Sequence, residues 1–539
     1  MTLKNKNRID GPTEADVIIS GGGPVGIGLA IDLALNGVSS VVIERHANIQ
    51  RIPKGQNLTP RTGEHFRRWG VTEAIRAAST IPKEYGGGVV SYGTFLSKFH
   101  YEWFDRSKIV EFYAATNERL PQYETEAVLR GRAFECENIK LLTGWSFASF
   151  VESENNVTVN IIKTNGTDER TITARYLVGC DGAHSAVREA AGFKLKTDSH
   201  DQLMALLVFR SLQLDQKLSK YGEKTIFNAI NPEMDGYWQF LGRVDLDCNW
   251  FYHSPVPQHA KGDKFDFKQL IEKAVGASID IEFEYIGFWD LRMSLADTYG
   301  EGRVFIAGDA AHSHPPYGGY GINLGFEDAR NLSWKLTALL QGWGGENLLA
   351  SYAAERRPVF ESTRDDFILK SIIEDRKFIE RYDPKVDLSS FQDAWERRSA
   401  GDDSLVTQYL PHYSGSPIIC SNSYKSSGAV GVHTVEAREG YHLAPVSFED
   451  GTQLWDYIGE GFTFLSLIPS QALVRAFKDA AVVYGVPLKT IDLTEHAICD
   501  IYEAEAILIR PDQFVAWKGK GERVDANQIL ARAIGKFVG

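Results

Sequence analysis

Val17-Ile-Ile-Ser-Gly21-Gly-Gly23-Pro-Val-Gly26 decides the fold of this 539-residue chain. The apolar run predicts a strand that ends in a Gly-rich turn, and the helix-like segment Ile27–Asn36 follows. Gly21, Gly23 and Gly26 fit the G-x-G-x-x-G spacing of a dinucleotide-binding turn, where phosphate approaches the backbone and a helix N-terminus. Glycines also form ordinary tight turns, so the spacing needs supporting context.

That context is an acidic residue at the end of the next predicted strand. Residues 15–44 read as strand, turn, helix and strand, and Glu44 lies about 20 residues after the turn. A carboxylate at this place can accept hydrogen bonds from ribose hydroxyls. Arg45 follows directly and either lies close to the nucleotide or is a solvated surface arginine.

A second segment, nearly three hundred residues later, suggests which dinucleotide. Arg303-Val-Phe-Ile-Ala-Gly308-Asp309-Ala-Ala-His312 is an apolar strand with an acid at its tip, and the Gly-rich stretch Pro315–Gly325 follows. Asp309 can accept a ribityl hydroxyl, and backbone amides around the glycines can face a flat ring. The alternative is a helix-capping acid before a flexible loop. Taken with the first segment, the pair predicts a flavin.

Composition limits the partners and the compartment. Charges sum to 58 − 71 = −13 without a basic block, so neither nucleic acid nor an anionic membrane is an expected partner. No stretch approaches the roughly 20 apolar residues that span a bilayer. The polar segment Met1–Glu14 lacks the apolar core of a secretory signal. Five scattered cysteines show no metal-ligand or redox spacing, so we expect a cytoplasmic protein without a metal site.

The pattern along the chain predicts an α/β and α+β protein of several units. A discontinuous Rossmann-like nucleotide domain is expected at residues 14–192 and 291–381. Residues 193–290 contain short strands rich in Tyr, Trp and Phe, which predict an inserted antiparallel sheet that binds substrate. Residues 382–430 are polar and read as a linker, and residues 431–539 form a further domain.

Three motifs in this order resemble one enzyme family. They are Gly21–Gly26, the segment Gly179–Arg188 and Gly308–His312, and the similarity covers about residues 15–360. Together they resemble the single-component (group A) FAD-dependent aromatic hydroxylases, whose familiar members are para-hydroxybenzoate hydroxylase and phenol hydroxylase. The resemblance implies that NADH or NADPH reduces FAD as a transient co-substrate. A flavin C4a-hydroperoxide formed with O₂ would then hydroxylate a phenolic or other electron-rich ring, with displacement of a ring substituent as one variant.

The same resemblance assigns roles to individual residues. Asp181 and Arg188 would serve the segment shared by flavin and NAD(P)H, and Gln122 resembles a glutamine that touches the flavin phosphate or ribityl chain. The remaining cofactor-binding candidates divide between the ADP part, the ribityl chain and the ring: Gly21, Gly23, Pro24, Gly26, Glu44 and Arg45; Asp309; and Gly319, Gly321, Ile322 and Asn323.

Substrate and catalytic residues are less clearly marked. Relatives often carry an aspartate base where this chain has Gln56 and Asn57, and neither amide takes a proton. The base therefore stays unassigned, with His253 and His312 as candidates beside Pro316, and a self-ionised phenol would need none. The expected pocket lining, for which ordinary core packing is the alternative, is Gln56, Tyr237, Trp238, Phe240, Phe251 and Trp289.

The C-terminal unit carries a second resemblance. Residues 506–517 resemble the end of the thioredoxin-like domain of phenol-hydroxylase-type enzymes, but no C-x-x-C is present. A scaffold role or a contact in a homodimer is therefore expected. Three alternatives to the aromatic hydroxylase remain open: a flavin-dependent oxidase, a polyketide or Baeyer–Villiger oxygenase, and a flavin-binding redox sensor without turnover.

Overall fold

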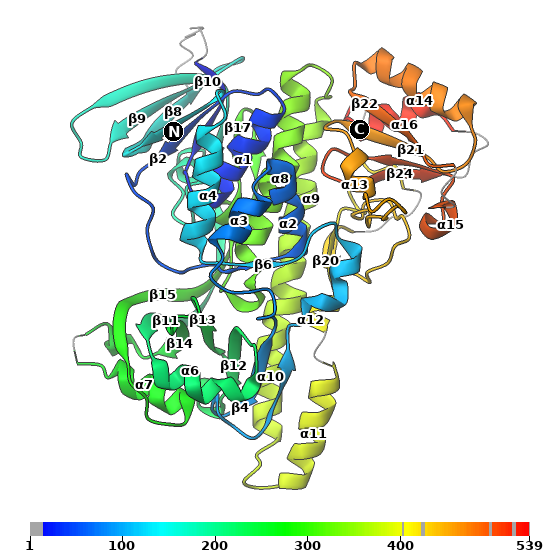
Figure 1. The fold of residues 1–539 in the computed structure, drawn as a ribbon. Helices are drawn as coiled ribbons and strands as arrows, with labels where there is room; N and C mark the ends of the chain where they lie inside the picture. Colours follow the sequence, from blue (N-terminus) through cyan, green and yellow to red (C-terminus); the bar gives the residue numbers. More distant parts are fainter. Residues whose placement is uncertain are drawn as a thin grey trace.

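The computed structural model describes residues 14–262, 264–401, 404–421, 426–494, 498–519 and 524–537. Apart from Glu14, the polar N-terminal segment lies outside these residues. Two eight-stranded sheets and a four-stranded C-terminal sheet are arranged around the long helices of residues 321–381, which we call the helical column (Figure 1). No helix of the described residues is long and apolar enough to cross a membrane.

The first sheet confirms the Rossmann-like prediction. Its strands run in the order β16-β17-β10-β1-β2-β7, and β1, β2, β7, β10 and β17 are parallel neighbours. The apolar runs of β1 and β2 are buried, as expected for a parallel sheet covered on both faces. β9 pairs antiparallel with β10 around Asn165-Gly166. The strands are β1 Ala15–Ser20, β2 Ser40–Glu44, β7 Ile139–Thr143, β8 Trp145–Glu152, β9 Val157–Lys163, β10 Glu169–Gly179, β16 Gly300–Glu301 and β17 Val304–Ile306.

Helices from distant parts of the chain pack together beside this sheet. α1 follows β1 directly and packs against α8 and α4. α8 is apolar or buried over most of its length and continues through a short loop into α9. The helices of this unit are α1 Pro24–Leu35, α2 Pro60–Trp69, α3 Thr72–Ala78, α4 Gln122–Phe134, α5 Ala186–Ala190, α8 Gly321–Leu340 and α9 Asn347–Ser362.

The second sheet is larger than the predicted insertion at residues 193–290. Its order is β18-β15-β11-β14-β13-β12-β4-β5, so β4 and β5 come from before the insertion and β18 from after it. β4 pairs parallel with β12, whereas the other pairs are antiparallel. The elements are β4 Gly88–Tyr92, β5 His100–Trp103, β11 Leu195–Arg210, β12 Ile226–Ile230, β13 Gln239–Arg243, β14 Asn249–Val256, β15 Glu282–Ala296, β18 His312–Ser313, α6 Leu212–Leu218 and α7 Phe267–Val275.

Residues 382–430 differ from the expected linker because part of the segment folds into helices. Phe391 and Trp395 lie one turn apart on α11, and both rings contact Tyr92 and Phe378. This aromatic cluster stabilises α11 against the second sheet and the helical column. The elements are α10 Lys370–Arg381, α11 Leu388–Gly401, α12 Ser404–Thr407, β19 Tyr409–His412 and β20 Gly428–Val430, and a π-helical turn, Thr363–Leu369, joins α9 to α10.

The C-terminal unit is an α/β layer beside α8 and α9 (Figure 1). β21 and β22 are parallel, and β23 and β24 extend the sheet antiparallel in the order β22-β21-β23-β24. α14 and α16 bury Phe477 and Leu530 against one face, where Trp334 of α8 joins the same cluster. The elements are α13 Leu454–Tyr457, α14 Gln471–Tyr484, α15 Ile498–Tyr502, α16 Ala526–Ala533, β21 Phe462–Ser466, β22 Leu488–Asp492, β23 Ala506–Ile509 and β24 Val515–Gly519.

Candidate active site

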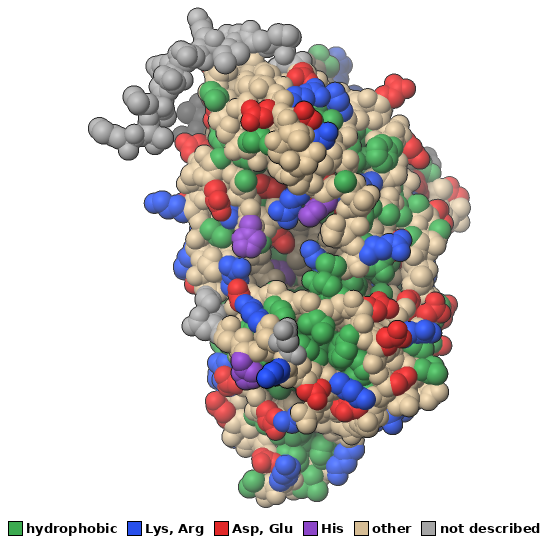
Figure 2. Space-filling view, turned by 90° about the vertical axis from the view of Figure 1, so that its left-hand side faces the viewer, with side chains coloured by type: hydrophobic (Ala, Val, Ile, Leu, Met, Phe, Trp, Pro, Cys, Tyr) green, Lys and Arg blue, Asp and Glu red, His purple; other side chains and the backbone are tan. Residues whose placement is uncertain are grey.

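One cavity of about 560 Å³ joins the two segments that the sequence singled out. Gly21 follows β1, Asp181 follows β10 and Asp309 follows β17. Because these three strands are parallel neighbours, their carboxyl ends meet at one edge of the sheet. All three residues line the cavity, and the face between the two large sheets is hollowed (Figure 2).

The glycines of the first turn have different physical roles. Gly21 has φ +108°, and a Cβ there would collide with the carbonyl of Cys180. A Cβ on Gly26 would collide with the carbonyl of Gly21, so Gly26 lies beneath the turn and does not line the cavity. At Gly23 a Cβ would meet nothing within 4 Å and would project into open space. α1 begins there without a side-chain cap, so its first amides are free for a pyrophosphate.

Glu44 is buried at the same edge and is held by the backbone. Its carboxylate accepts hydrogen bonds from the amides of Gly22, at 2.8 Å, and His46, at 2.7 Å. Each oxygen retains a lone pair for a ribose hydroxyl. Pro24 and Arg45 also line the cavity, and Arg45 is exposed beside His46. The adenosine end of a dinucleotide fits this group.

α4 contributes more to the cavity than the sequence analysis predicted. Gln122, Glu126 and Arg130 lie on successive turns of this helix, and all three line the cavity. Arg130 pairs with Glu126 at 2.7 Å and donates to the carbonyl of Gly22 at 3.1 Å. The i, i+4, i+8 spacing after Gln122 was the signal that would have found the other two.

The second Gly-rich segment, residues 315–325, forms another part of the cavity wall. The surrounding protein raises the pKa of Asp309 by desolvation, although its carboxylate is accessible from the cavity. Gly319, Gly321 and Ile322 line the cavity, and α8 begins at Gly321 without a side-chain cap. Its first amides and positive dipole end can stabilise negative charge on the edge of a ring.

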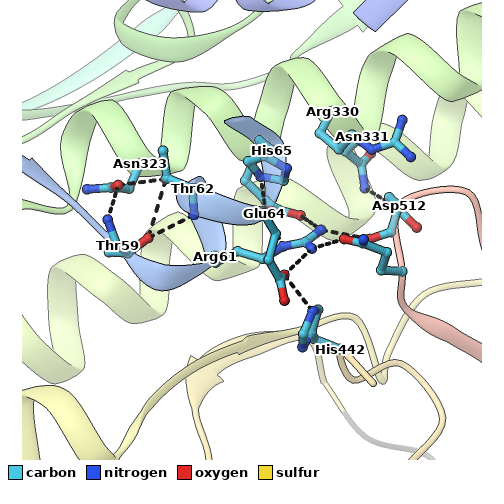
Figure 3. Close-up of polar contacts among 12 residues, drawn as sticks. Thr59, Arg61, Thr62, Glu64, His65, Asn323, Arg330, Asn331, His442 and Asp512 are labelled. Carbon is cyan, nitrogen blue, oxygen red and sulfur yellow. Dashed lines mark hydrogen bonds and ion pairs between the residues drawn. The ribbon is translucent and has the colours of Figure 1, made fainter. Parts of the chain in front are cut away.

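Asn323 and Arg188 support this wall from behind and do not line the cavity. Asn323 accepts from the Thr59 amide at 2.9 Å and from the Thr62 hydroxyl at 2.7 Å, and its amide donates to the Gly319 carbonyl at 2.7 Å (Figure 3). Arg188 donates to the Ala310 carbonyl at 2.9 Å. Both residues fix the backbone that faces the cavity.

His312 also lies behind the wall. Its Nε2 is 2.7 Å from Asp328, which also binds Arg356 at 2.7 Å and the Gly308 amide at 2.9 Å, and all these groups are buried. The ring is therefore committed to an ionic cluster. His314, which the sequence analysis did not select, lines the cavity instead, and burial lowers its pKa to about 4.

A polar network ties the C-terminal unit to the same wall (Figure 3). Arg61 on α2 donates to Glu327 of α8 at 3.0 Å and to the Asp512 carbonyl at 2.7 Å, and it also contacts Gln513. Glu64 binds His442 at 2.8 Å. Because Glu327 lies one turn after Asn323, α2 connects the C-terminal unit to the first turn of α8.

The far end of the cavity is apolar. Phe240 and Phe251 line it as predicted, and the catalytic candidate Pro316 lines it as well. Ile226, Trp103 and Phe104 also line it, although the sequence analysis did not select them. His253 and Gln56 supply polar atoms there. Burial lowers the pKa of His253 to about 4, and its Nδ1 accepts a hydrogen bond from Trp289 at 3.3 Å. Both amide atoms of Gln56 are buried without a partner among the described residues.

Three of the predicted lining residues lie elsewhere. Trp289 does not line the cavity and lies behind His253, to whose Nδ1 it donates a hydrogen bond. Trp238 donates to Asp375 at 2.7 Å and stacks on Tyr317. Its neighbour Tyr237 lies under Arg376. The strand β13 begins only at Gln239, so the two preceding side chains pack toward the helical column.

The open cradle at Gly23, the acid at Asp309 and the two uncapped helix N-termini fit FAD, and comparison with known proteins agrees. A family described as FAD binding domain matches residues 14–366, and one described as aromatic-ring hydroxylase, C-terminal, matches residues 436–539. A 4-methyl-5-nitrocatechol 5-monooxygenase from Burkholderia sp is 28% identical, with 97% of each chain covered.

Two solved structures extend the similarity to the whole fold. RebC with bound 7-carboxy-K252c has a TM-score of 0.84 and 28% identity, covering 98% of this chain and 100% of RebC. Aklavinone-11 hydroxylase with FAD and aklavinone has a TM-score of 0.79 and 25% identity, covering 97% and 100%. The fold and site thus define an FAD-dependent monooxygenase. The chain belongs to the FAD-dependent aromatic and polyketide hydroxylase family.

Proposed function

We propose that this enzyme uses NADH or NADPH and O₂ to hydroxylate a phenolic ring. The observation that carries the proposal is the single cavity that runs from the FAD cradle to the aromatic side chains Phe240, Phe251 and Trp103. Bound FAD supplies the activation of oxygen, and the protein supplies position, charge and exclusion of water. Phe240, Phe251 and Trp103 give the apolar enclosure that such chemistry needs.

His253 is suited to orient the ring. Its Nδ1 is occupied by Trp289, so the proton of the neutral imidazole is on Nε2, which is free to donate to a phenol oxygen. With its pKa near 4, the imidazole stays neutral at physiological pH. Gln56 offers a donor and an acceptor nearby in the same cavity. Neither group is a strong base, which favours a phenol that ionises by itself, such as a nitrophenol or catechol.

Relatives support two substrate classes. The Burkholderia relative is named for a nitrocatechol, which is an acidic single-ring phenol, and a hydroxylation at the nitro-bearing carbon would displace nitrite. Aklavinone and polyketides occur in the names of other relatives. The lack of a base at Gln56 and Asn57 favours the first class, and a polyketide hydroxylase is the second candidate.

We also infer that the C-terminal unit is thioredoxin-like, because its strand order β22-β21-β23-β24 with α14 between β21 and β22 matches that arrangement. Cys420 and Cys499 are free and far apart in sequence, so a scaffold role is favoured over redox exchange. The homodimer and the cytoplasmic location stay predictions.

Oxidation of NADH and NADPH by the FAD-loaded protein tests the proposal. Catechols, nitrocatechols, nitrophenols, hydroxypyridines and a polyketide phenol are compared, with hydrogen peroxide, nitrite and product mass measured in parallel. We expect a single-ring acidic phenol to stimulate oxidation and to gain one oxygen atom. Stoichiometric peroxide with every phenol, or no stimulation by any of them, would reject the hydroxylase.

A further inference from the structure

A second cavity of about 190 Å³ lies next to the apolar end of the active-site cavity. Its lining comes from the second sheet, the π-helical turn and α10, with single residues from α11, α12 and β20. Val90, Asn228, Trp238, Phe367 and Ser371 line it together with the charged residues Asp366, Lys370, Glu374 and Arg398. Among the described residues, Trp103 is the one that lines both cavities. The two spaces therefore meet at this indole.

Strand register shows that the two cavities share one face of the sheet. His253 pairs with Phe240, Phe240 with Asn228, and Asn228 with Val90. Directly paired residues of neighbouring strands point to the same face. The first two line the active-site cavity and the last two line the second cavity, so one continuous row of side chains passes from one space into the other.

Trp103 reaches this row from the next one. Ile226 pairs with Gly88, and Gly88 pairs with Trp103, at the edge of the sheet. Gly88 has no side chain, and the side chain of Ile226 takes up the place that a Cβ would occupy there. Trp103 is only 4% exposed, and its ring is held by edge contacts with Trp238 at 5.3 Å and a tilted contact with Phe104 at 4.9 Å.

We propose that Trp103 is a specificity-determining residue that limits the substrate to a single ring. The inference deepens the proposed function and rests on it. The space behind Trp103, at about 190 Å³, exceeds the roughly 150 Å³ of a cavity that holds benzene, and its polar and charged lining suits a further ring that carries hydroxyl groups. The buried Oδ1 of Asn228 has no partner among the described residues and would accept a hydrogen bond from a hydroxyl group on that ring.

Removal of the indole should therefore admit fused-ring phenols. Trp103→Ala and the milder Trp103→Phe are compared with the wild type, all loaded with FAD. The probes are catechol and alizarin, a three-ring dihydroxyanthraquinone. Two quantities are measured: the dissociation constant, from the change in flavin absorbance, and kcat/KM for NADH- or NADPH-dependent hydroxylation.

We expect the ratio of kcat/KM for alizarin to that for catechol to rise at least tenfold in Trp103→Ala, with tighter alizarin binding. Ser371 lines only the second cavity, so Ser371→Phe refills that space from α10. The double variant should lose the gain, while Ser371→Phe alone should turn over catechol like the wild type. Should Trp103→Ala fail to retain FAD, Trp103→Phe gives the same comparison with a smaller expected rise.

Failure of this inference differs from failure of the proposed function. If no phenol stimulates the wild type, the hydroxylase itself is rejected. If catechol is hydroxylated but the ratio of kcat/KM for alizarin to that for catechol is unchanged in both Trp103 variants, only the role of Trp103 in specificity is rejected. Equal use of alizarin and catechol by the wild type would also overturn it, because the passage would already be open.

Discussion

Trp289 determines which ring nitrogen of the neutral His253 carries the proton, because its indole Nε1 donates to Nδ1 of the imidazole at 3.3 Å. The bond leaves the second ring nitrogen as a donor toward the cavity. His253→Asn should lower kcat/KM for the phenol about tenfold, the effect of losing a hydrogen bond of about 1.4 kcal/mol. Trp289→Phe should give a smaller loss by freeing the ring. Steady-state kinetics at saturating NADH or NADPH measures both, and equal kcat/KM in all three proteins would exclude this role.

The lowered pKa of His253 also predicts how stability depends on pH. In the unfolded chain this histidine has its ordinary pKa near 6.5, and in the folded protein about 4. Below about pH 6.5 the unfolded state therefore binds the extra proton, and the free energy of unfolding falls as the pH falls toward 4. The loss from this one group is about 2 kcal/mol at pH 5. Urea unfolding of the wild type and His253→Asn at pH 7.5 and pH 5 should show a smaller loss in the variant.

The open space at Gly23 predicts a variant that folds but does not hold the cofactor. Gly23 has φ −75° and ψ −177°, which any residue adopts, and a Cβ there meets no protein atom within 4 Å. Gly23→Val should leave the apoprotein folded and abolish FAD retention, because the side chain occupies the phosphate space. Gly131→Val on α4 is the matched control, since a Cβ there also meets nothing. Circular dichroism and flavin absorbance separate the two outcomes.

Asp309 tests the other end of the cofactor. Asp309→Asn keeps the shape of the side chain but removes its charge, so the dissociation constant for FAD should rise about tenfold through loss of a charge-assisted hydrogen bond. Titration of apoprotein with FAD gives the constant. Glu44→Gln should also weaken FAD binding, because one Glu44 oxygen becomes an NH₂ group that cannot accept from the backbone amide that it faces. An unchanged constant for Asp309→Asn would remove it from the binding site.

Arg61 and Arg67 separate two kinds of contact with the C-terminal unit. Arg61 is buried against Glu327, Glu64 and the Asp512 carbonyl, so Arg61→Met removes the guanidinium that neutralises two buried carboxylates and should cost about 3–5 kcal/mol of stability. Arg67 pairs with Asp456 at the surface, and Arg67→Met should cost at most about 1 kcal/mol. Only the first should also weaken FAD retention, through Asn323. Equal effects on thermal unfolding and on flavin release would contradict this connection.

Local chemistry was predictable from the sequence, and long-range pairing was not. The Gly21 turn and the Asp309 strand tip carry their signals within a few residues, and parallel pairing brings them together at one cavity. β4 joins β12 more than a hundred residues later, and no local pattern shows that partner, so Trp103 was missed. His312 and His314 are two residues apart in the sequence. The contact of His312 with the buried Asp328 holds its ring behind the cavity, whereas His314 lines the cavity.

β18 has a mechanical consequence. The two-residue strand that follows Asp309 pairs with β15, with Leu295 opposite His312. The chain that follows Asp309 is therefore hydrogen-bonded to the edge of the second sheet. Any tilt of that sheet must pull on the loop ahead of α8. We therefore expect the loop that would hold the flavin ring and the sheet that would hold the substrate to move together, because β18 belongs to both.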